Sequence, residues 1–97
     1  NKINIDSNKK ITIQTINILE IIENFNYIDC IKIDIEGYEY KILPLIFKNK
    51  YKIGKVVCEF HGNKSKKNSN LHLHAQYKET QKYIKNNNLE NWIIEWI

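Results

Sequence analysis

Five ionisable side chains are the candidates for chemistry in this sequence. Asp34, Glu36 and Glu39 stand close together, and Glu59 and His61 follow further along the chain. Carboxylates and imidazoles take up or release protons near neutral pH, and carboxylates also stabilise a nearby positive charge. The three carboxylates at 34–39 can act together with Glu59 and His61 only if the fold brings these two parts of the chain close together.

The elements around these residues predict that they meet. The segment 28–35 is rich in β-branched residues and predicts an interior strand, and Gly37 allows the chain to turn sharply after it. The segment 38–47 has the spacing of an amphipathic helix, and 55–61 predicts a second strand. A strand, a helix and a strand in this order pair in parallel, and ligands of such sheets bind beyond the carboxyl ends of the strands. All five side chains are therefore expected at one edge of the sheet.

A structural role for the same side chains remains open on these grounds. Lys32 lies on the polar face of the first strand, and if buried it would need a partner such as Glu36 or Glu59. Glu39 falls in the first turn of its helix, where the helix dipole favours a carboxylate. The residues alone leave a functional site and simple charge pairing as alternatives.

The flanking segments predict further strands and helices. Alternation over 10–15 predicts a half-buried strand, and a helix is expected to follow from Asn17. Helical spacing over 71–85 predicts another helix. The apolar segment 91–97 predicts a short strand that pairs antiparallel at a sheet edge or else covers the core.

Two interruptions are expected. Pro44 lacks an N–H, so a break is expected where it falls inside the predicted helix 38–47. The stretch 62–70 contains no apolar residue and predicts an exposed loop.

Composition limits the classes of protein that fit. The 97 residues form at most one small domain or part of a larger one, and 42% hydrophobic residues suffice for a core. The absence of methionine, even at position 1, predicts a piece of a longer or processed chain. No apolar run reaches the roughly 18 residues of a membrane helix. Cys30 and Cys58 lie among apolar residues, which predicts reduced core cysteines and an intracellular, cytoplasmic protein.

The net charge of +4 comes from lysine alone, because arginine is absent. Proteins that read phosphate usually also carry arginine, so this excess is weak evidence for binding to nucleic acid or a membrane. His72 and His74, with His61 earlier in the chain, raise the question of a metal site. Residues two apart on a helix point to different sides, so no metal site is predicted.

The stretch that holds the first three carboxylates resembles the signature of FkbM-type methyltransferases. The resemblance rests on Lys32-x-Asp34-x-Glu36-Gly37-x-Glu39, with an apolar pair one turn later. The flanks are similar too: 11–17 resembles the family's strand before a helix start, and 56–61 resembles its following strand, which often ends in Glu-apolar-His. The similarity covers roughly residues 10–62.

This resemblance implies a Rossmann-like α/β fold that uses S-adenosylmethionine. The expected sheet is mainly parallel, with helices on both faces and an antiparallel edge strand. The family's cofactor-binding glycines and ribose-binding acid lie on earlier strands, and this chain contains no Gly-x-Gly. Residues 1–97 are therefore interpreted as a single partial domain, the C-terminal part, which alone is expected to bind the cofactor poorly.

The resemblance also suggests roles for the five side chains. Asp34 is expected beside the cofactor and the acceptor. Glu36 and Glu39 would hold the loop or contact the substrate, and Glu59 and His61 would bind the acceptor or act as a base. The acceptor would offer an oxygen or nitrogen of a small molecule or sugar. The alternative hypothesis is a non-catalytic α/β module that binds a partner through its lysines.

Overall fold

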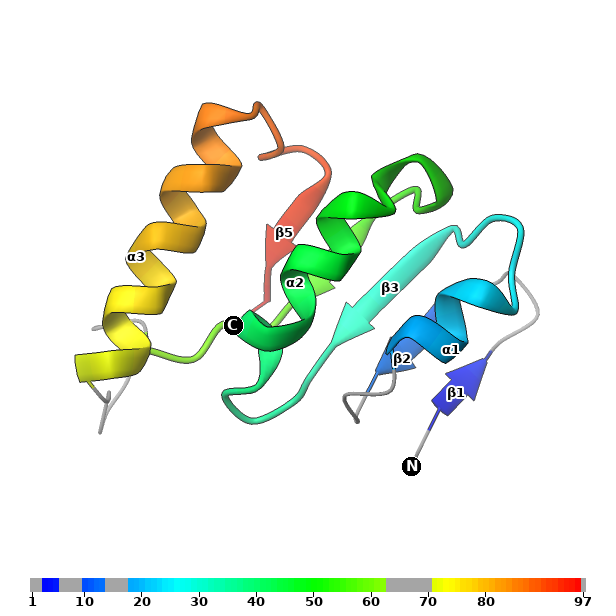
Figure 1. Cartoon of the computed structure of the whole chain (residues 1–97), viewed down its shortest axis with the longest axis horizontal. Coiled ribbons are helices and arrows are strands. Elements are labelled where there is room, and N and C mark those ends of the chain that lie inside the picture. Colours follow the sequence, from blue (N-terminus) through cyan, green and yellow to red (C-terminus); the bar gives the residue numbers. More distant parts are fainter. Residues whose placement is uncertain (1–2, 6–9, 14–17, 63–70, 97) are drawn as a thin grey trace.

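The computed structural model describes residues 3–5, 10–13, 18–62 and 71–96. They form one five-stranded sheet with three α-helices and a short 3₁₀ helix (Figure 1). The strands are β1 (Ile3–Ile5), β2 (Lys10–Ile13), β3 (Cys30–Ile33), β4 (Val56–Cys58) and β5 (Ile93–Glu95). The helices are α1 (Ile18–Glu23), α2 (Glu39–Lys48) and α3 (Leu71–Asn86), and the 3₁₀ helix η1 is Lys50–Lys52.

The sheet confirms the predicted parallel arrangement. Its strand order is β1-β2-β3-β4-β5, and β2 to β5 pair in parallel. The antiparallel edge strand is β1, a segment for which the sequence predicted no strand. For 91–97 the sequence left an antiparallel edge strand or a cover for the core as alternatives. The strand β5 follows α3 and pairs in parallel with β4, not antiparallel, and Trp92 is buried in the core. A helix between two strands carries the chain back to the same end of the sheet, which makes parallel pairing the natural outcome.

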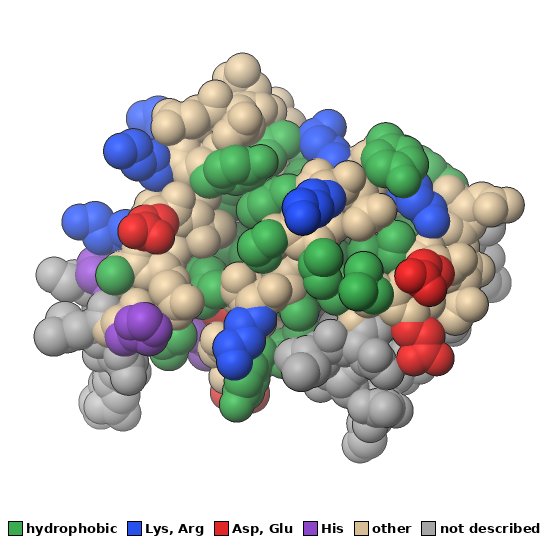
Figure 2. Space-filling model, in the orientation of Figure 1, with side chains coloured by type: hydrophobic (Ala, Val, Ile, Leu, Met, Phe, Trp, Pro, Cys, Tyr) green, Lys and Arg blue, Asp and Glu red, His purple; other side chains and the backbone are tan. Residues whose placement is uncertain are grey.

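The described helices lie on one face of the sheet, and α2 stands between α1 and α3 (Figure 1). The expectation of helices on both faces is therefore not met in this part of the chain. The physical reason is the strand order: each crossover moves one strand further in the same direction, and crossovers of one hand then place their helices on one side. Seen from outside, this face shows charged side chains around an apolar strip (Figure 2).

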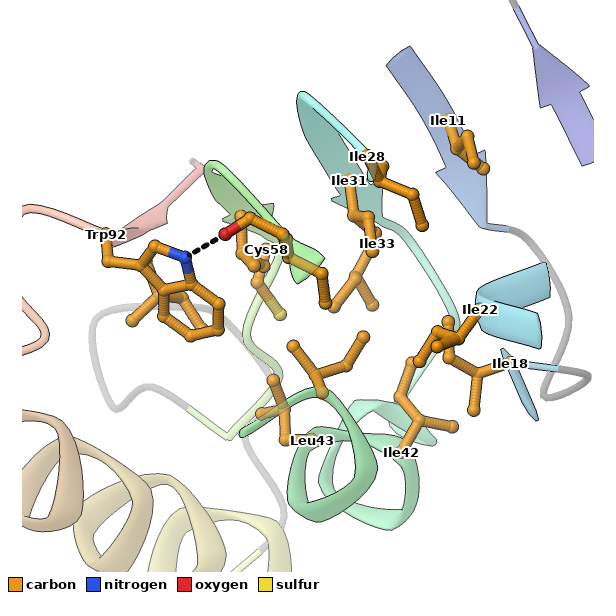
Figure 3. Packing of buried hydrophobic residues seen from close by; sticks show 14 of the residues in the cluster. Ile11, Ile18, Ile22, Ile28, Ile31, Ile33, Ile42, Leu43, Cys58 and Trp92 are labelled. Atoms are coloured by element: carbon orange, nitrogen blue, oxygen red, sulfur yellow. Dashed lines mark hydrogen bonds between the residues drawn. The ribbon is translucent and has the colours of Figure 1, made fainter. Parts of the chain in front are cut away.

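The core lies between the sheet and these helices (Figure 3). Alternate strand residues such as Ile31 and Ile33 are fully buried against the helices. From α2, Leu43 and its neighbours fill the space beneath. Each buried side chain of this size stabilises the fold by roughly 1.5–3 kcal/mol. Trp92 closes one side, and its indole N–H donates to the Ile53 carbonyl at 2.8 Å.

Pro44 does not break α2, contrary to the sequence-based expectation. The helix runs without interruption from Glu39 to Lys48, with Pro44 exposed on its outer side. The inward stripe, which includes Ile42, Leu43 and Ile46, is buried against the sheet. The buried residues before and after Pro44 in the sequence hold the helix against the sheet despite the missing N–H.

The other face of the sheet carries Lys32, whose ammonium lies 3.7 Å from the centre of the Trp96 ring. The expected carboxylate partner is replaced by a cation–π contact, because no described carboxylate lies within ion-pair distance of Lys32. Glu36 and Glu59 are therefore not the partners of Lys32. None of the described helices is long and apolar enough to cross a membrane. The predicted loop 62–70 lies outside the described residues from position 63, as does the predicted start of the helix at Asn17.

Candidate functional site at the carboxyl ends of β3 and β4

A tight turn joins β3 to α2 and sets the position of the site. The Tyr38 N–H donates to the Ile35 carbonyl at 2.6 Å, and the two central residues, Glu36 and Gly37, have φ angles of 28° and 91°. Two positive φ angles in succession are the pattern of a type I′ turn. Glycine adopts this conformation freely, but a glutamate there is strained. The predicted sharp turn at Gly37 is confirmed.

Glu39, the first residue of α2, carries a carboxylate with no exposed surface. One oxygen accepts the Gly37 N–H at 2.9 Å, and the other accepts the His61 N–H at 2.6 Å. A buried carboxylate is tolerated only with such donors, and its place at a helix N-terminus adds favourable dipole energy. Glu39 thus ties the β3–α2 turn to the segment that follows β4.

His61 completes this network. Its Nδ1 lies 3.1 and 3.2 Å from the two Glu39 oxygens and 3.2 Å from the Gly37 nitrogen. Because the Gly37 N–H has the carboxylate as its nearer acceptor, the pattern assigns a proton to Nδ1 that His61 donates to Glu39. In the neutral ring, the other nitrogen, Nε2, then carries the lone pair. It lies 3.8 Å from a carboxylate oxygen of Glu36 and 3.8 Å from one of Glu59.

Exposure differs sharply around the ring. The Glu39 side chain is 0% exposed, those of His61 and Glu59 are 21% and 28% exposed, and that of Glu36 is 89% exposed. The buried carboxylate therefore holds Nδ1, and Nε2 lies between two further carboxylates, of which that of Glu36 is largely exposed. A carboxylate that fixes one imidazole nitrogen while the other acts on a substrate is a known arrangement for general base catalysis.

Asp34 belongs to the same edge but not to this network. Ile33 pairs with Cys58, so Asp34 and Glu59 leave the sheet side by side. Asp34 is half-buried, and its carboxylate makes no hydrogen bond or ion pair with the other described residues. The structure thus brings four of the five predicted side chains into contact and leaves Asp34 beside them. The functional roles predicted for all five stay predictions.

Tyr40 is a contributor that the sequence did not point out. Its hydroxyl donates to the backbone carbonyl of His61, and its ring lies 6.3 Å from that of Phe60. Burial, with a smaller contribution from the Glu39 charge, raises the pKa of the Tyr40 hydroxyl far above its ordinary value, so it remains a donor. A side chain that acts on a backbone atom leaves no motif, and only its place next to Glu39 could have drawn attention to it.

The other two histidines lie in the first turn of α3. His72 is exposed, whereas His74 is half-buried, with Nδ1 2.7 Å from the Gly62 carbonyl and its ring stacked on Tyr77. His74 is partly buried because the first turn of α3 packs against Gly62. Within the described part of the chain, no group of three or more His, Cys, Asp or Glu side chains could hold a metal ion.

The sequence model of the family described as Methyltransferase FkbM domain matches residues 2–88. The chain belongs to this FkbM methyltransferase family. The match extends well beyond the motif region and includes β1 through α3. It confirms the resemblance seen in the strand–turn–helix signature, and it supports methyl transfer as the class of activity. No curated protein and no solved structure matched the FkbM chain in the corresponding searches.

Proposed function

We propose that this chain acts in the transfer of a methyl group from S-adenosylmethionine to an oxygen or nitrogen of a small-molecule or sugar acceptor, with His61 as the base. The family match supports the reaction class. One observation supports the role of His61: Glu39 occupies Nδ1 from the buried side, and Nε2 lies beside the largely exposed carboxylate of Glu36.

The residues at this edge fit one part of the cofactor. S-adenosylmethionine supplies, when bound, a methyl group activated by a positively charged sulfur. Asp34, Glu36 and Glu59 are carboxylates, and such a set suits a cation. The three glycines of the chain are Gly37, Gly54 and Gly62, so the sequence contains no Gly-x-Gly turn for the nucleoside part. Asp34 and Glu36 would therefore hold the charged end.

The chain's own residues would have two tasks, which are to hold the His61 ring in place and to take a proton from the acceptor. His61 Nε2 would take the proton of the acceptor hydroxyl or amine, and Glu39 would keep the ring in the required tautomer. The positive charge that the ring then carries would lie beside Glu36 and Glu59, both 3.8 Å from Nε2. Because Glu39 is buried, its proposed role is to position His61 rather than to touch the acceptor.

The test uses the protein expressed from its complete reading frame. Cofactor binding is measured by calorimetry, and transfer is measured from methyl-labelled S-adenosylmethionine into the small-molecule fraction of a cell extract. His61→Gln should retain cofactor binding and lose transfer by roughly 100-fold or more, the usual contribution of a general base. Asp34→Ala and Glu36→Ala should weaken cofactor binding.

His72→Gln is the matched control, because His72 is exposed and lies on α3. It should behave as the wild type in both measurements. Wild-type transfer by folded His61→Gln would remove His61 as the base. Unchanged binding and transfer in both carboxylate variants would remove the assignment of this edge as the cofactor site.

A further inference from the structure

A groove runs between α2 and α3, outside the carboxylate edge. Its volume is about 410 Å³, which lies in the range of small-molecule sites. The α2 side contributes Tyr40, Leu43 and Phe47, and the α3 side contributes Thr80 and Tyr83. Figure 2 shows apolar side chains along this furrow on the helix-covered face.

Three aromatic residues line the groove. The rings of Phe47 and Tyr83 are tilted by 35° with their centres 4.8 Å apart, and Tyr40 is the third aromatic residue. Stacked and tilted contacts with such rings favour a flat, aromatic guest. Thr80 offers one hydroxyl that can donate or accept a hydrogen bond.

The charges at the groove disfavour a guest that carries a single charge. Lys48 lines it from α2 and Glu79 from α3, so each bank carries one charge of opposite sign. A guest with a single charge would be attracted by one bank and repelled by the other. Its charge would also lose hydration among apolar side chains, at a free-energy cost that is much smaller for a neutral ring.

Tyr40 connects the groove to His61. Its ring forms part of the lining, and its hydroxyl donates to the His61 carbonyl. Glu39, the neighbour of Tyr40 in the first turn of α2, holds the ring of the same histidine. A guest that shifts the Tyr40 ring therefore acts on the segment that carries Nε2.

We propose that the groove between α2 and α3 is a binding site for an uncharged aromatic ring compound, and that Tyr40 transmits its occupancy to His61. This inference goes beyond methyl transfer and does not depend on it. Its readouts are binding and magnetic resonance of the histidine ring, which can succeed or fail whatever the reaction is.

Indole is the first probe, with tryptamine as its cationic and indole-3-propionate as its anionic relative. Each is titrated into the full-length protein labelled with ¹⁵N, and the amide resonances of the groove and the ring nitrogens of His61 are followed. Indole should give saturable shifts at the groove residues and at His61. The two charged relatives should bind no more tightly than indole. Tighter binding by a charged relative, or no saturable shift with indole, would overturn the assigned ligand class.

Two variants separate binding from transmission. Tyr40→Phe keeps the ring and loses the hydroxyl, so indole should still shift the groove amides and should no longer shift His61. Tyr83→Ala removes an aromatic ring from the lining of the groove and should weaken indole binding several-fold. The Tyr83 side chain is partly exposed, so the protein should still fold. Tyr51→Ala is the control, because Tyr51 is 77% exposed and lies outside the groove.

Each outcome decides one part of the proposal. An unchanged His61 response in Tyr40→Phe would refute the transmission. Unchanged indole affinity in folded Tyr83→Ala, or an equal loss in Tyr51→Ala, would refute the groove as the site.

Discussion

At the carboxyl ends of β3 and β4, side chains that can titrate hold the chain segments together, whereas at the amino ends the backbone does most of this work. The first edge has Glu39 and His61 as its centre. At the second edge, the N–H of Ile28 donates to Lys52 and that of Gly54 donates to Ile28, each at 2.8 Å. Both edges connect the same two strands, so the difference does not come from topology.

The contrast makes the carboxyl-end edge the stronger candidate for a functional site. Backbone hydrogen bonds suffice to close the amino-end edge, aided by one ammonium contact from Lys52 to the Ile22 carbonyl at 2.7 Å. The carboxyl-end edge instead buries a carboxylate, which folding alone does not require. Buried ionisable groups in contact with a half-exposed imidazole are typical of functional sites.

The largest effect is expected from Glu39→Ala. Removal of the carboxylate leaves the N–H groups of Gly37 and His61 without their acceptor in a buried place. The free energy of unfolding should fall by roughly 3–5 kcal/mol, the usual effect of breaking a buried charged network. Urea denaturation followed by circular dichroism measures it. Glu23→Ala, an exposed carboxylate on α1, is the control and should have little effect; a similar small loss for Glu39→Ala would contradict the contrast.

The next effect compares one glycine from each edge. A Cβ at Gly62 would lie 2.3 Å from the Leu73 carbonyl oxygen, and its φ of 93° disfavours side chains. Gly62→Ala should therefore lower the free energy of unfolding by about 3 kcal/mol. Gly54→Ala should lower it by roughly half as much, because Gly54 lies outside the left-handed region although its Cβ would approach the Asp29 oxygen at 2.7 Å. Thermal unfolding of both variants decides the order, and the reverse order would show that the carboxyl-end edge is the more tolerant one.

A smaller effect is expected from Lys52→Met at the amino-end edge. This change keeps most of the aliphatic side chain and removes the donor to the Ile22 carbonyl at the end of α1. The loss should be about 1 kcal/mol, as for a single partly exposed hydrogen bond. Lys55→Met, on an exposed residue, serves as the control in the same denaturation experiment. Equal midpoints for the two variants would mean that the ammonium contact contributes nothing.

The last effect appears only at alkaline pH. The Tyr77 hydroxyl donates to Glu95 at 2.9 Å, and burial together with this contact raises its pKa to about 12. In the unfolded chain a tyrosine ionises near pH 10, so the unfolded state gains relative stability as the pH rises from about 10 to about 12. The contribution of Tyr77 to the free energy of unfolding should be constant below pH 10 and fall above it.

Tyr77→Phe should show a shallower fall over that range, measured by urea denaturation at each pH. Tyr40 remains in this variant and its pKa is raised in the same direction, so part of the fall persists. Parallel curves for wild type and variant would show that Tyr77 does not couple ionisation to folding.

The sequence predicted the parallel strands and the meeting of the carboxylates because local patterns determine both. β-Branched runs such as 28–35 mark strands, and a strand–helix–strand order sets the direction of pairing. The strand β1 was not predicted, because its three residues are too short for a period to show. The direction of the strand in 91–97 could not be decided, because periodicity says nothing about direction.

The details of the site depended on three-dimensional packing. Glu39 is buried because the segment after β4 lies over the start of α2. The spacing of residues in the sequence does not show how close these two segments come. The same holds for Lys32, for which charge suggested a carboxylate while the fold supplied the Trp96 ring. Tyr40 acts on a backbone carbonyl, which any residue could provide.

The left-handed backbone of Glu36 has a consequence for laboratory evolution. A glutamate codon becomes a glycine codon by one nucleotide change, and glycine would relieve strain of about 1 kcal/mol at this position. The same change would delete the most exposed carboxylate beside His61. A library screened only for heat resistance would therefore accumulate Glu36→Gly, while one screened for the proposed methyl transfer would discard it.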